Sequence, residues 1–479
     1  MEIYKIPQLL KRGVFTAEDM ISEKLEAVRK KDNEYKFMIS FLQDYALQKA
    51  KNIDNKIACG KKIGKLAGIP FAIKDNIVMM HGKTTCGSKM LRDFVSPYNA
   101  HVVDLIENED GIIIGKTNMD EFAMGSSTEY SYFHKTLNPY DKERVPGGSS
   151  GGSAAMVAAV DGCVTLGSDT GGSVRQPAAF CGVVGFKPTY GAISRYGLIA
   201  FSSSLDQIGI MTNKVKEVSY VFDLLKKKDQ KDASMQHRIE INQTFDGINR
   251  NIENCKIAVP YKIFNEKAAQ NVKEKLSEVS YELAKENFIV EEVPVLYDKY
   301  YIPIYYTIAS AEVSSNLSRF DGVRFGLNSD NAKDFNEMFR KNRTDGFGDE
   351  VKRRIMIGTF ILSEGYEDRF YQKAKKFQRD LSNRVDEIFD TYDVILLPTT
   401  PTTAFKFKEK SGKPIEMYYS DFFTSFANIA GNPAITIPAG VDDNNLPIGL
   451  QLIGDKYRED KLLNIANQIE KILQNSNLE

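Results

Sequence analysis

Two glycine- and serine-rich clusters constrain this chain more than any other feature of its sequence. The first reads GGSSGGS at 147–153 and the second reads GSDTGGS at 167–173, so that Ser149 and Ser173 lie 24 positions apart. Upstream, Lys74 follows the apolar run IPFAI at 69–73. Serines supply hydroxyl nucleophiles, glycines expose backbone N–H groups, and a lysine can act as a base. This combination predicts a hydrolase that uses serine without histidine.

Short apolar runs alternate with helical patterns around the clusters, which predicts an α/β fold. The predicted strands lie at 69–73, 112–114, 164–166 and 183–186, and the predicted helices at 101–109, 154–159 and 173–179. Such alternation indicates βα units and a mainly parallel sheet. Both clusters then lie at strand–helix junctions, where α/β proteins place their chemistry. Near the N-terminus, the sequence TAED from Thr16 resembles a helix-capping sequence.

Composition excludes several classes of protein. The 479 residues are 42% hydrophobic, which allows one large domain or two to three smaller ones. A net charge of −1 gives no argument for nonspecific nucleic-acid binding. The N-terminus lacks a signal-peptide core, and no run of 18 apolar residues predicts a membrane span. Five cysteines without a C-x-x-C pair and only four histidines argue against disulfides and metal sites, and favour a cytoplasmic protein.

The base that would activate a serine is the central question for this chemistry. GGSSG at 147–151 matches the nucleophile elbow G-x-S-x-G, but only His237 follows Ser149, in a polar stretch, where that fold requires an acid and then a histidine. No serine has a lysine three positions later, which excludes the Ser-x-x-Lys pattern. Lys74 therefore remains as the base, because a buried lysine amine can lose its proton near neutral pH. The alternative is that both clusters are flexible loops or phosphate nests.

Three separated motifs resemble the amidase signature family. They are KDN at 74–76, PGGSSGGS at 146–153 and GSDTGGSVRQPA at 167–178, in the family's order and spacing. The resemblance implies that Ser173 is the acylated nucleophile and that Ser149, preceded by a cis peptide, connects it to Lys74. It also implies an oxyanion hole made by backbone N–H groups, those of Thr170, Gly171, Gly172 and Ser173.

The resemblance also implies the architecture. We expect an α/β fold with a large mixed, mostly parallel twisted sheet that is covered by helices on both faces. We expect a single amidase-signature domain over 1–479, with its core motifs at 69–200 and a helical insertion lobe at about 300–390.

Further stretches narrow the resemblance within this family. Those at 121–129, 195–198, 311–322 and 350–356 resemble the A subunit of the glutamyl-tRNA(Gln) amidotransferase. That resemblance implies a glutamine site in which Arg353 binds the α-carboxylate, Asp421 binds the α-amine and Tyr305 lines the pocket. Arg353 or Arg354 could instead face solvent, Asp421 could be only a helix N-cap, and Tyr305 or its neighbour Tyr306 could be core. Tyr130, Tyr132, His134 and Ala192 depart from the family's usual residues.

The implied function is that of a glutaminase subunit. Ammonia from glutamine would pass to a partner B subunit, which would amidate misacylated Glu-tRNA(Gln), and also Asp-tRNA(Asn) in many relatives, in an ATP-dependent reaction. A small C subunit would complete a heterotrimer. ATP and Mg²⁺ would be used by the partner, so we expect no cofactor and no metal in this chain. The alternatives are a stand-alone amidase that acts on another small amide, and a non-catalytic scaffold.

Overall fold

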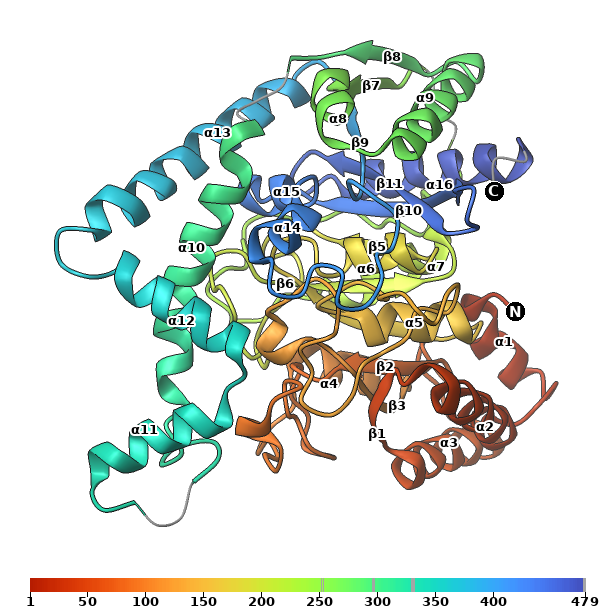
Figure 1. The fold of residues 1–479 in the computed structure, drawn as a ribbon. Helices are drawn as coiled ribbons and strands as arrows, with labels where there is room; N and C mark the ends of the chain where they lie inside the picture. The colour runs from red at the N-terminus through yellow and green to blue at the C-terminus, as the bar shows by residue number, and fades with distance from the viewer. Residues whose placement is uncertain (251, 253, 295–297, 329–331, 477–479) are drawn as a thin grey trace.

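A single mixed sheet runs through the molecule (Figure 1). The computed structural model describes residues 1–479 except 251, 253, 295–297, 329–331 and 477–479. The described strands form an 11-stranded sheet with the order β1-β3-β2-β4-β6-β5-β10-β11-β9-β7-β8. Their bounds in that order are Met38–Phe41, Ile112–Thr117, Pro70–Lys74, Val164–Asp169, Gln207–Thr212, Val184–Lys187, Ala434–Val441, Pro447–Gly454, Val394–Pro398, Lys256–Val259 and Ile289–Glu292.

The pairing confirms the predicted large mixed sheet but limits its parallel part. Parallel pairs occur in two places, β3-β2-β4 and β9-β7-β8. The centre, β4-β6-β5-β10-β11-β9, is antiparallel, as is the edge pair β1-β3. The physical reason is the connections, because β5 reaches β6, and β10 reaches β11, without the crossover helix that parallel neighbours need.

Helices cover both faces of the sheet, as predicted. Helices α5 (Gly151–Ala159) and α6 (Arg175–Phe180) pack on one face, and α7 (Val215–Leu225) and α16 (Glu459–Asn475) pack on the other. The remaining core helices are α1 (Ile6–Lys11), α2 (Ala17–Tyr35), α3 (Gln43–Ala58), α4 (His101–Asn108), α8 (Tyr261–Lys267), α9 (Gln270–Lys285), α14 (Pro414–Tyr418) and α15 (Ser425–Ala430). The predicted cap is present, because the Thr16 side chain accepts the N–H of Asp19 at 3.0 Å. None of the described helices is both long enough and apolar enough to cross a bilayer.

Four helices project from one edge of the core (Figure 1). They are α10 (Tyr301–Asn316), α11 (Phe335–Gly346), α12 (Asp349–Ile361) and α13 (Lys373–Phe389). Helix α10 packs against α12 and α13, and α13 packs against α15. These helices occupy the stretch where a lobe at about 300–390 was predicted, of which 329–331 lie outside the described residues. The packing brings α10 to the turn that follows β4, and α12 to the adjoining face of α10.

Candidate active site

Lys74 ends β2 in the interior of the protein, with no exposed surface. Its Nζ donates to Ser149 Oγ at 2.7 Å and to Ser168 Oγ at 2.9 Å. Burial lowers the pKa of Lys74 to about 7, although the nearby carboxylates of Asp120 and Asp169 oppose the shift. At neutral pH a large fraction of this amine is therefore uncharged and able to accept a proton from the Ser149 hydroxyl.

Ser149 is held rigidly against Lys74 by its backbone. The Gly148–Ser149 peptide bond is cis. The Gly148 N–H donates to Gln176 Oε1 at 2.8 Å, and the Ser149 carbonyl accepts the Asp120 N–H at 3.2 Å. A Cβ on Gly148 would lie 2.1 Å from Asp120 Oδ2, so only glycine fits at this position. These contacts fix the direction in which the Ser149 hydroxyl points.

Ser173 lies beside Ser149 at the turn between β4 and α6. Its carbonyl oxygen accepts the N–H of Ser150 at 3.2 Å, which joins the two Gly-Ser clusters directly. Ser149 is fully buried, whereas Ser173 is partly exposed. A partly exposed serine next to a buried serine–lysine pair suits a nucleophile, because such a residue must reach a substrate while its proton leaves inward.

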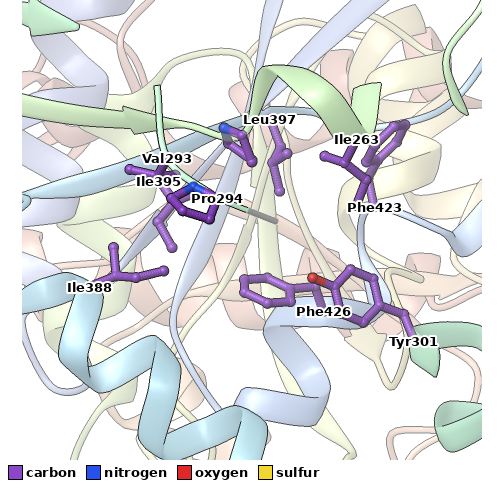
Figure 2. A pocket seen from close by; sticks show the side chains of 10 residues that line it. Ile263, Val293, Pro294, Tyr301, Ile388, Ile395, Leu397, Phe423 and Phe426 are labelled. Atoms are coloured by element: carbon purple, nitrogen blue, oxygen red, sulfur yellow. The ribbon is translucent and has the colours of Figure 1, made fainter. Parts of the chain in front are cut away.

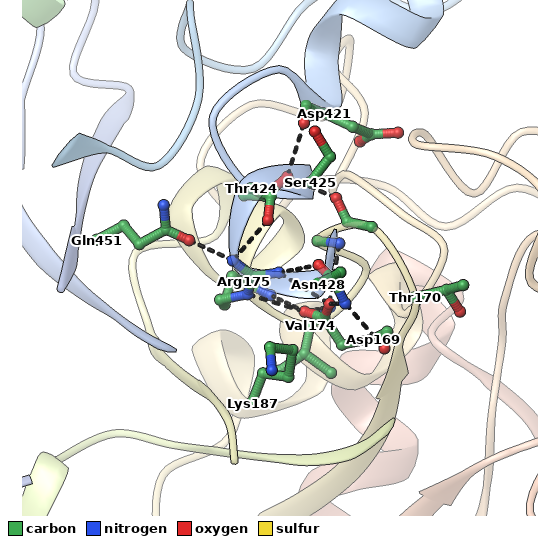
Figure 3. A network of polar contacts seen from close by, with 12 residues as sticks. Asp169, Thr170, Val174, Arg175, Lys187, Asp421, Thr424, Ser425, Asn428 and Gln451 are labelled. Atoms are coloured by element: carbon green, nitrogen blue, oxygen red, sulfur yellow. Dashed lines mark hydrogen bonds and ion pairs between the residues drawn. The ribbon is translucent and has the colours of Figure 1, made fainter. Parts of the chain in front are cut away.

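A buried ion pair shapes the loop that carries Ser173 (Figure 3). Arg175 donates to Asp169 through Nε at 3.1 Å and through Nη2 at 2.9 Å, and both side chains have no exposed surface. Burial opposes ionisation of Asp169, but the charge and hydrogen bonds of Arg175 prevail and lower the pKa of Asp169 to about 2. The same guanidinium reaches α15 through Asn428 Oδ1 at 2.5 Å and also contacts Gln451. Through Arg175, the carboxylate of Asp169 is thus linked to α15.

The predicted oxyanion residues 170–173 form a tight turn around Asp169. The N–H of Gly172 donates to Asp169 Oδ1 at 2.9 Å, so this N–H has a partner within the protein. A Cβ on Gly171 would lie 2.5 Å from the Tyr305 hydroxyl oxygen, and one on Gly172 would lie 2.0 Å from Thr424 Oγ1. Glycine is therefore required at both positions. Tyr305 is buried, with its hydroxyl end against the turn.

Asp421 forms a second buried polar cluster near the turn. It is 8% exposed, and its carboxylate accepts hydrogen bonds from Ser126 Oγ at 2.9 Å and from the Tyr306 hydroxyl at 3.1 Å. Burial raises the pKa of Asp421 to about 7, against the opposing hydrogen bond of Ser126 and the charge of Arg354. Thr424, rather than Asp421, is the N-cap residue of α15. The carboxylate is therefore free of a capping role.

Arg354, rather than Arg353, belongs to this cluster. The side chain of Arg353 is 42% exposed and pairs with the buried carboxylate of Glu350, which also accepts a hydrogen bond from Arg354 Nε at 2.8 Å. The side chain of Arg354 is 3% exposed, and its guanidinium carbon lies 5.1 Å from the ring centre of Tyr306 and 5.3 Å from that of Tyr418. One step along an α-helix rotates a side chain by about 100°, which is why two adjacent arginines face different ways.

Several residues of this region were not identified from the sequence. Ser126, Thr424, Tyr418 and Glu350 carry no motif of their own, although Ser126 and Glu350 lie in the stretches at 121–129 and 350–356 that narrowed the resemblance. Among the unusual residues, Tyr130 is half-buried and its N–H donates to Asp120 Oδ1 at 3.2 Å, whereas Tyr132 is exposed. The residues that depart from the family's usual pattern thus begin at the end of the loop that binds Asp120.

A separate apolar cavity is lined by none of these polar groups (Figure 2). Phe423, Phe426 and Tyr301 line it together with aliphatic side chains from β9 and the region of α8. Its free space of about 20 Å³ holds about one water molecule. Such a cavity is a packing defect rather than a substrate site. In the described part of the chain, no group of three or more histidine, cysteine, aspartate or glutamate side chains is arranged to hold a metal ion.

Known proteins resemble this chain over nearly its whole length. The model of the family described as Amidase matches residues 19–463. The chain is 47% identical over 455 residues to the glutamyl-tRNA(Gln) amidotransferase A subunit 2 of Clostridium acetobutylicum, covering 95% of both proteins. It is also 47% identical over 468 residues to the glutamyl-tRNA(Gln) amidotransferase A subunit of Desulforamulus reducens, covering 98% of this chain and 96% of that protein.

Comparison with solved structures agrees with the sequence similarity. The crystal structure of the glutamyl-tRNA(Gln) amidotransferase A subunit from Thermotoga maritima superposes with a TM-score of 0.77 at 40% identity, covering 98% of this chain and 92% of that one. The resemblance that was predicted from the motifs is confirmed. The chain therefore belongs to the amidase family.

Proposed function

We propose that this chain is the glutaminase subunit of a tRNA-dependent amidotransferase and hydrolyses glutamine to glutamate and ammonia. The observation that carries the proposal is the buried contact of 2.7 Å between Lys74 Nζ and Ser149 Oγ, next to the partly exposed Ser173. The near-full-length similarity to A subunits of glutamyl-tRNA(Gln) amidotransferases supports the choice of substrate.

The chemistry proceeds in two steps. Ser173 Oγ attacks the side-chain amide carbon of glutamine while its proton passes through Ser149 to the neutral Lys74. The tetrahedral intermediate collapses when the amide nitrogen takes a proton from the same relay, which releases ammonia and leaves a glutamyl ester on Ser173. Water, deprotonated by the relay, then hydrolyses the ester and regenerates the serine. The N–H groups of Thr170, Gly171 and Ser173 stabilise the negative oxygen, a contribution of roughly 2.7–4 kcal/mol for each donor, whereas the N–H of Gly172 is already bonded to Asp169.

The cluster around Asp421 recognises the α-ammonium and α-carboxylate groups of glutamine. The Asp421 carboxylate pairs with the α-ammonium, and its two hydrogen-bond donors Ser126 and Tyr306 orient it. Arg354 binds the α-carboxylate of glutamine, the role that the sequence assigned to Arg353. Of the two guanidinium groups, only that of Arg354 faces this cluster. A planar guanidinium binds a carboxylate with two parallel hydrogen bonds.

Ammonia is consumed by a partner in this proposal. A B subunit, joined by a C subunit in a heterotrimer, would use ATP and Mg²⁺ to activate misacylated Glu-tRNA(Gln), or Asp-tRNA(Asn), in the cytoplasm. The similarity to A subunits of glutamyl-tRNA(Gln) amidotransferases supports the first of these tRNA substrates. The present chain supplies ammonia only, and its own reaction requires neither a metal nor a nucleotide.

The decisive experiment measures glutamine hydrolysis by the purified chain, alone and with B and C subunits. We expect turnover that rises when the partners and misacylated tRNA are present, and none with a Ser173→Ala variant. Equal turnover of unrelated small amides without any gain from partners would support a stand-alone amidase instead. Amidation of tRNA from glutamine by the Ser173→Ala variant would support a scaffold.

A further inference from the structure

A second cavity, polar and of about 660 Å³, adjoins the Asp169 network, and neither Tyr305 nor Asp421 lines it. One wall is a face of α13, and the other walls are the β5–β6 connection, the end of α15 and the loop before α16. Its volume suits a ligand of nucleotide size, since small-molecule sites span roughly 300–1,000 Å³. Asn428 lines it and also donates to Asp169 Oδ1 at 2.9 Å, so the cavity shares a residue with the nucleophile loop.

The charge of this cavity is one-sided. Four cationic side chains line it, and its described lining residues include no aspartate or glutamate. The four cations are Lys375, Lys376, Arg379 and Lys456. The first three lie at i, i+1 and i+4 on α13, where like charges repel one another. Burial lowers the pKa of Lys375, and the positive charge of Arg379 lowers it further. The negative charge of Glu312 acts in the opposite direction.

The nearby carboxylates are already engaged. Glu312 accepts hydrogen bonds from Ser204 and from the Tyr371 hydroxyl, and Asp386 pairs with Lys456 at 2.6 Å. Among the described residues, Lys376 and Arg379 have neither an ion-pair nor a hydrogen-bond partner for their side chains. Two positive charges at the cavity therefore remain uncompensated.

Capping of α15 does not account for these cations. A helix C-terminus attracts positive charge, and α15 ends at the cavity floor. However, the terminal carbonyls have neutral donors: Gln378 Nε2 binds the Ile429 oxygen at 3.1 Å and Ser382 Oγ binds the Ala430 oxygen at 3.2 Å. The cations are thus available for an anion from outside the protein.

We propose that this cavity binds a phosphorylated ligand, with its phosphate groups on Lys376 and Arg379 and with Lys375 beside them. Phosphate groups match the site because they carry up to two negative charges each and accept several hydrogen bonds, and arginine binds them with two donors. The phosphates could belong to a free nucleotide or to the backbone of an RNA. The proposal is independent of glutamine hydrolysis, because none of these cations contacts Lys74, Ser149 or Ser173.

The test measures binding of pyrophosphate and of ADP to the full chain by calorimetry at low salt. We expect saturable binding that weakens by about tenfold or more in the double variant Lys376→Gln/Arg379→Gln, because two phosphate contacts are lost. The matched control Lys61→Gln/Lys62→Gln removes the same charge from two exposed lysines that lie elsewhere, after α3, and should bind like the wild type. The charge-preserving Lys376→Arg/Arg379→Lys variant should also retain binding.

A labelled single-stranded RNA distinguishes the two sources. RNA is identified as the source if pyrophosphate displaces the RNA and the Lys376→Gln/Arg379→Gln variant no longer binds it. A nucleotide is identified as the source if the chain binds ADP but does not bind the RNA. The proposal is overturned if neither pyrophosphate nor ADP binds at millimolar concentration, or if Lys376→Gln/Arg379→Gln and the control Lys61→Gln/Lys62→Gln lose affinity equally. Circular dichroism verifies the fold of each variant, which should be unchanged because Lys376 and Arg379 are exposed.

Discussion

Thr424 Oγ1 donates a hydrogen bond of 2.7 Å to the carbonyl oxygen of Gly171. Thr424 follows Asp421 by three residues, and its hydroxyl also reaches the Asp421 carbonyl at 3.2 Å. One side chain therefore connects two parts of the proposed site: the segment that would bind the α-ammonium group of glutamine, and the turn that would stabilise the oxyanion.

Thr424→Val removes this hydrogen bond and keeps the shape of the side chain. We expect kcat for glutamine hydrolysis to fall by about tenfold, because the Gly171 carbonyl loses its partner and the turn is less well held. KM should stay within about threefold, since Asp421 and Arg354 are untouched. Thr424→Ser, which keeps the hydroxyl, is the control. Equal kcat values in the two variants would show that the hydrogen bond does not position the turn.

Ser173→Ala removes the proposed nucleophile. Glutamine hydrolysis should fall by about 10³-fold or more, because no acyl ester can form, while the Kd for glutamine stays close to that of the wild type. Ser150→Ala is the matched control from the first cluster, since Ser150 Oγ donates to the Ser168 carbonyl at 3.2 Å and is fully buried. We expect that control to lose stability rather than activity. Substantial turnover by Ser173→Ala would show that another residue is acylated.

The pH dependence of kcat should report Lys74. Its pKa, lowered by burial to about 7, means that the amine is protonated and unable to accept a proton below this pH. We therefore expect kcat to rise with pH through a midpoint near 7, and Lys74→Met to reduce kcat by about 10²–10⁴-fold.

Lys187 is the control for that interpretation. Burial also lowers its pKa to about 7, but its Nζ donates to the carbonyls of Pro188 and Asn432 rather than to a serine. Lys187→Met should lower the melting temperature and leave the midpoint of the kcat profile in place. If instead Lys187→Met abolished the rise of kcat with pH, the base would have been assigned to the wrong lysine.

The sequence could predict those parts of the candidate site that lie in continuous motifs. Lys74, Ser149 and Ser173 were predicted because their neighbours have a distinctive order, and the fold brings these three residues together. The contact between Thr424 and Gly171 joins residues 253 positions apart, and no local pattern specifies it. The choice between Arg353 and Arg354 depended on how α12 is rotated against α10, which is set by packing. The antiparallel centre of the sheet was missed for a similar reason, since apolar runs give strands but not their partners.

Asp421 should control the KM for glutamine. Burial raises its pKa to about 7, so the carboxyl group loses its charge as pH falls through this value and cannot pair with the α-ammonium. KM should therefore rise below about pH 7, whereas the fall in kcat belongs to Lys74. Asp421→Asn should raise KM by about 30-fold and make KM independent of pH in this range. A variant whose KM still rose on acidification would mean that another group binds the ammonium.

Arg354 and Arg353 provide an internally matched pair on one helix. Arg354→Lys keeps the charge but loses the planar fork, so we expect KM for glutamine to rise by about tenfold or more with little change in melting temperature. Arg353→Lys, which changes a partly exposed side chain and keeps its charge beside Glu350, should leave both kcat and KM close to those of the wild type. Kinetics of the two variants with glutamine, and with a glutamine analogue whose α-carboxylate is amidated, separate a binding role from a structural one. If Arg354 binds that carboxylate, the amidated analogue should be turned over equally poorly by the wild type and by Arg354→Lys. A selective loss of glutamine affinity in Arg353→Lys would restore the assignment that the sequence favoured.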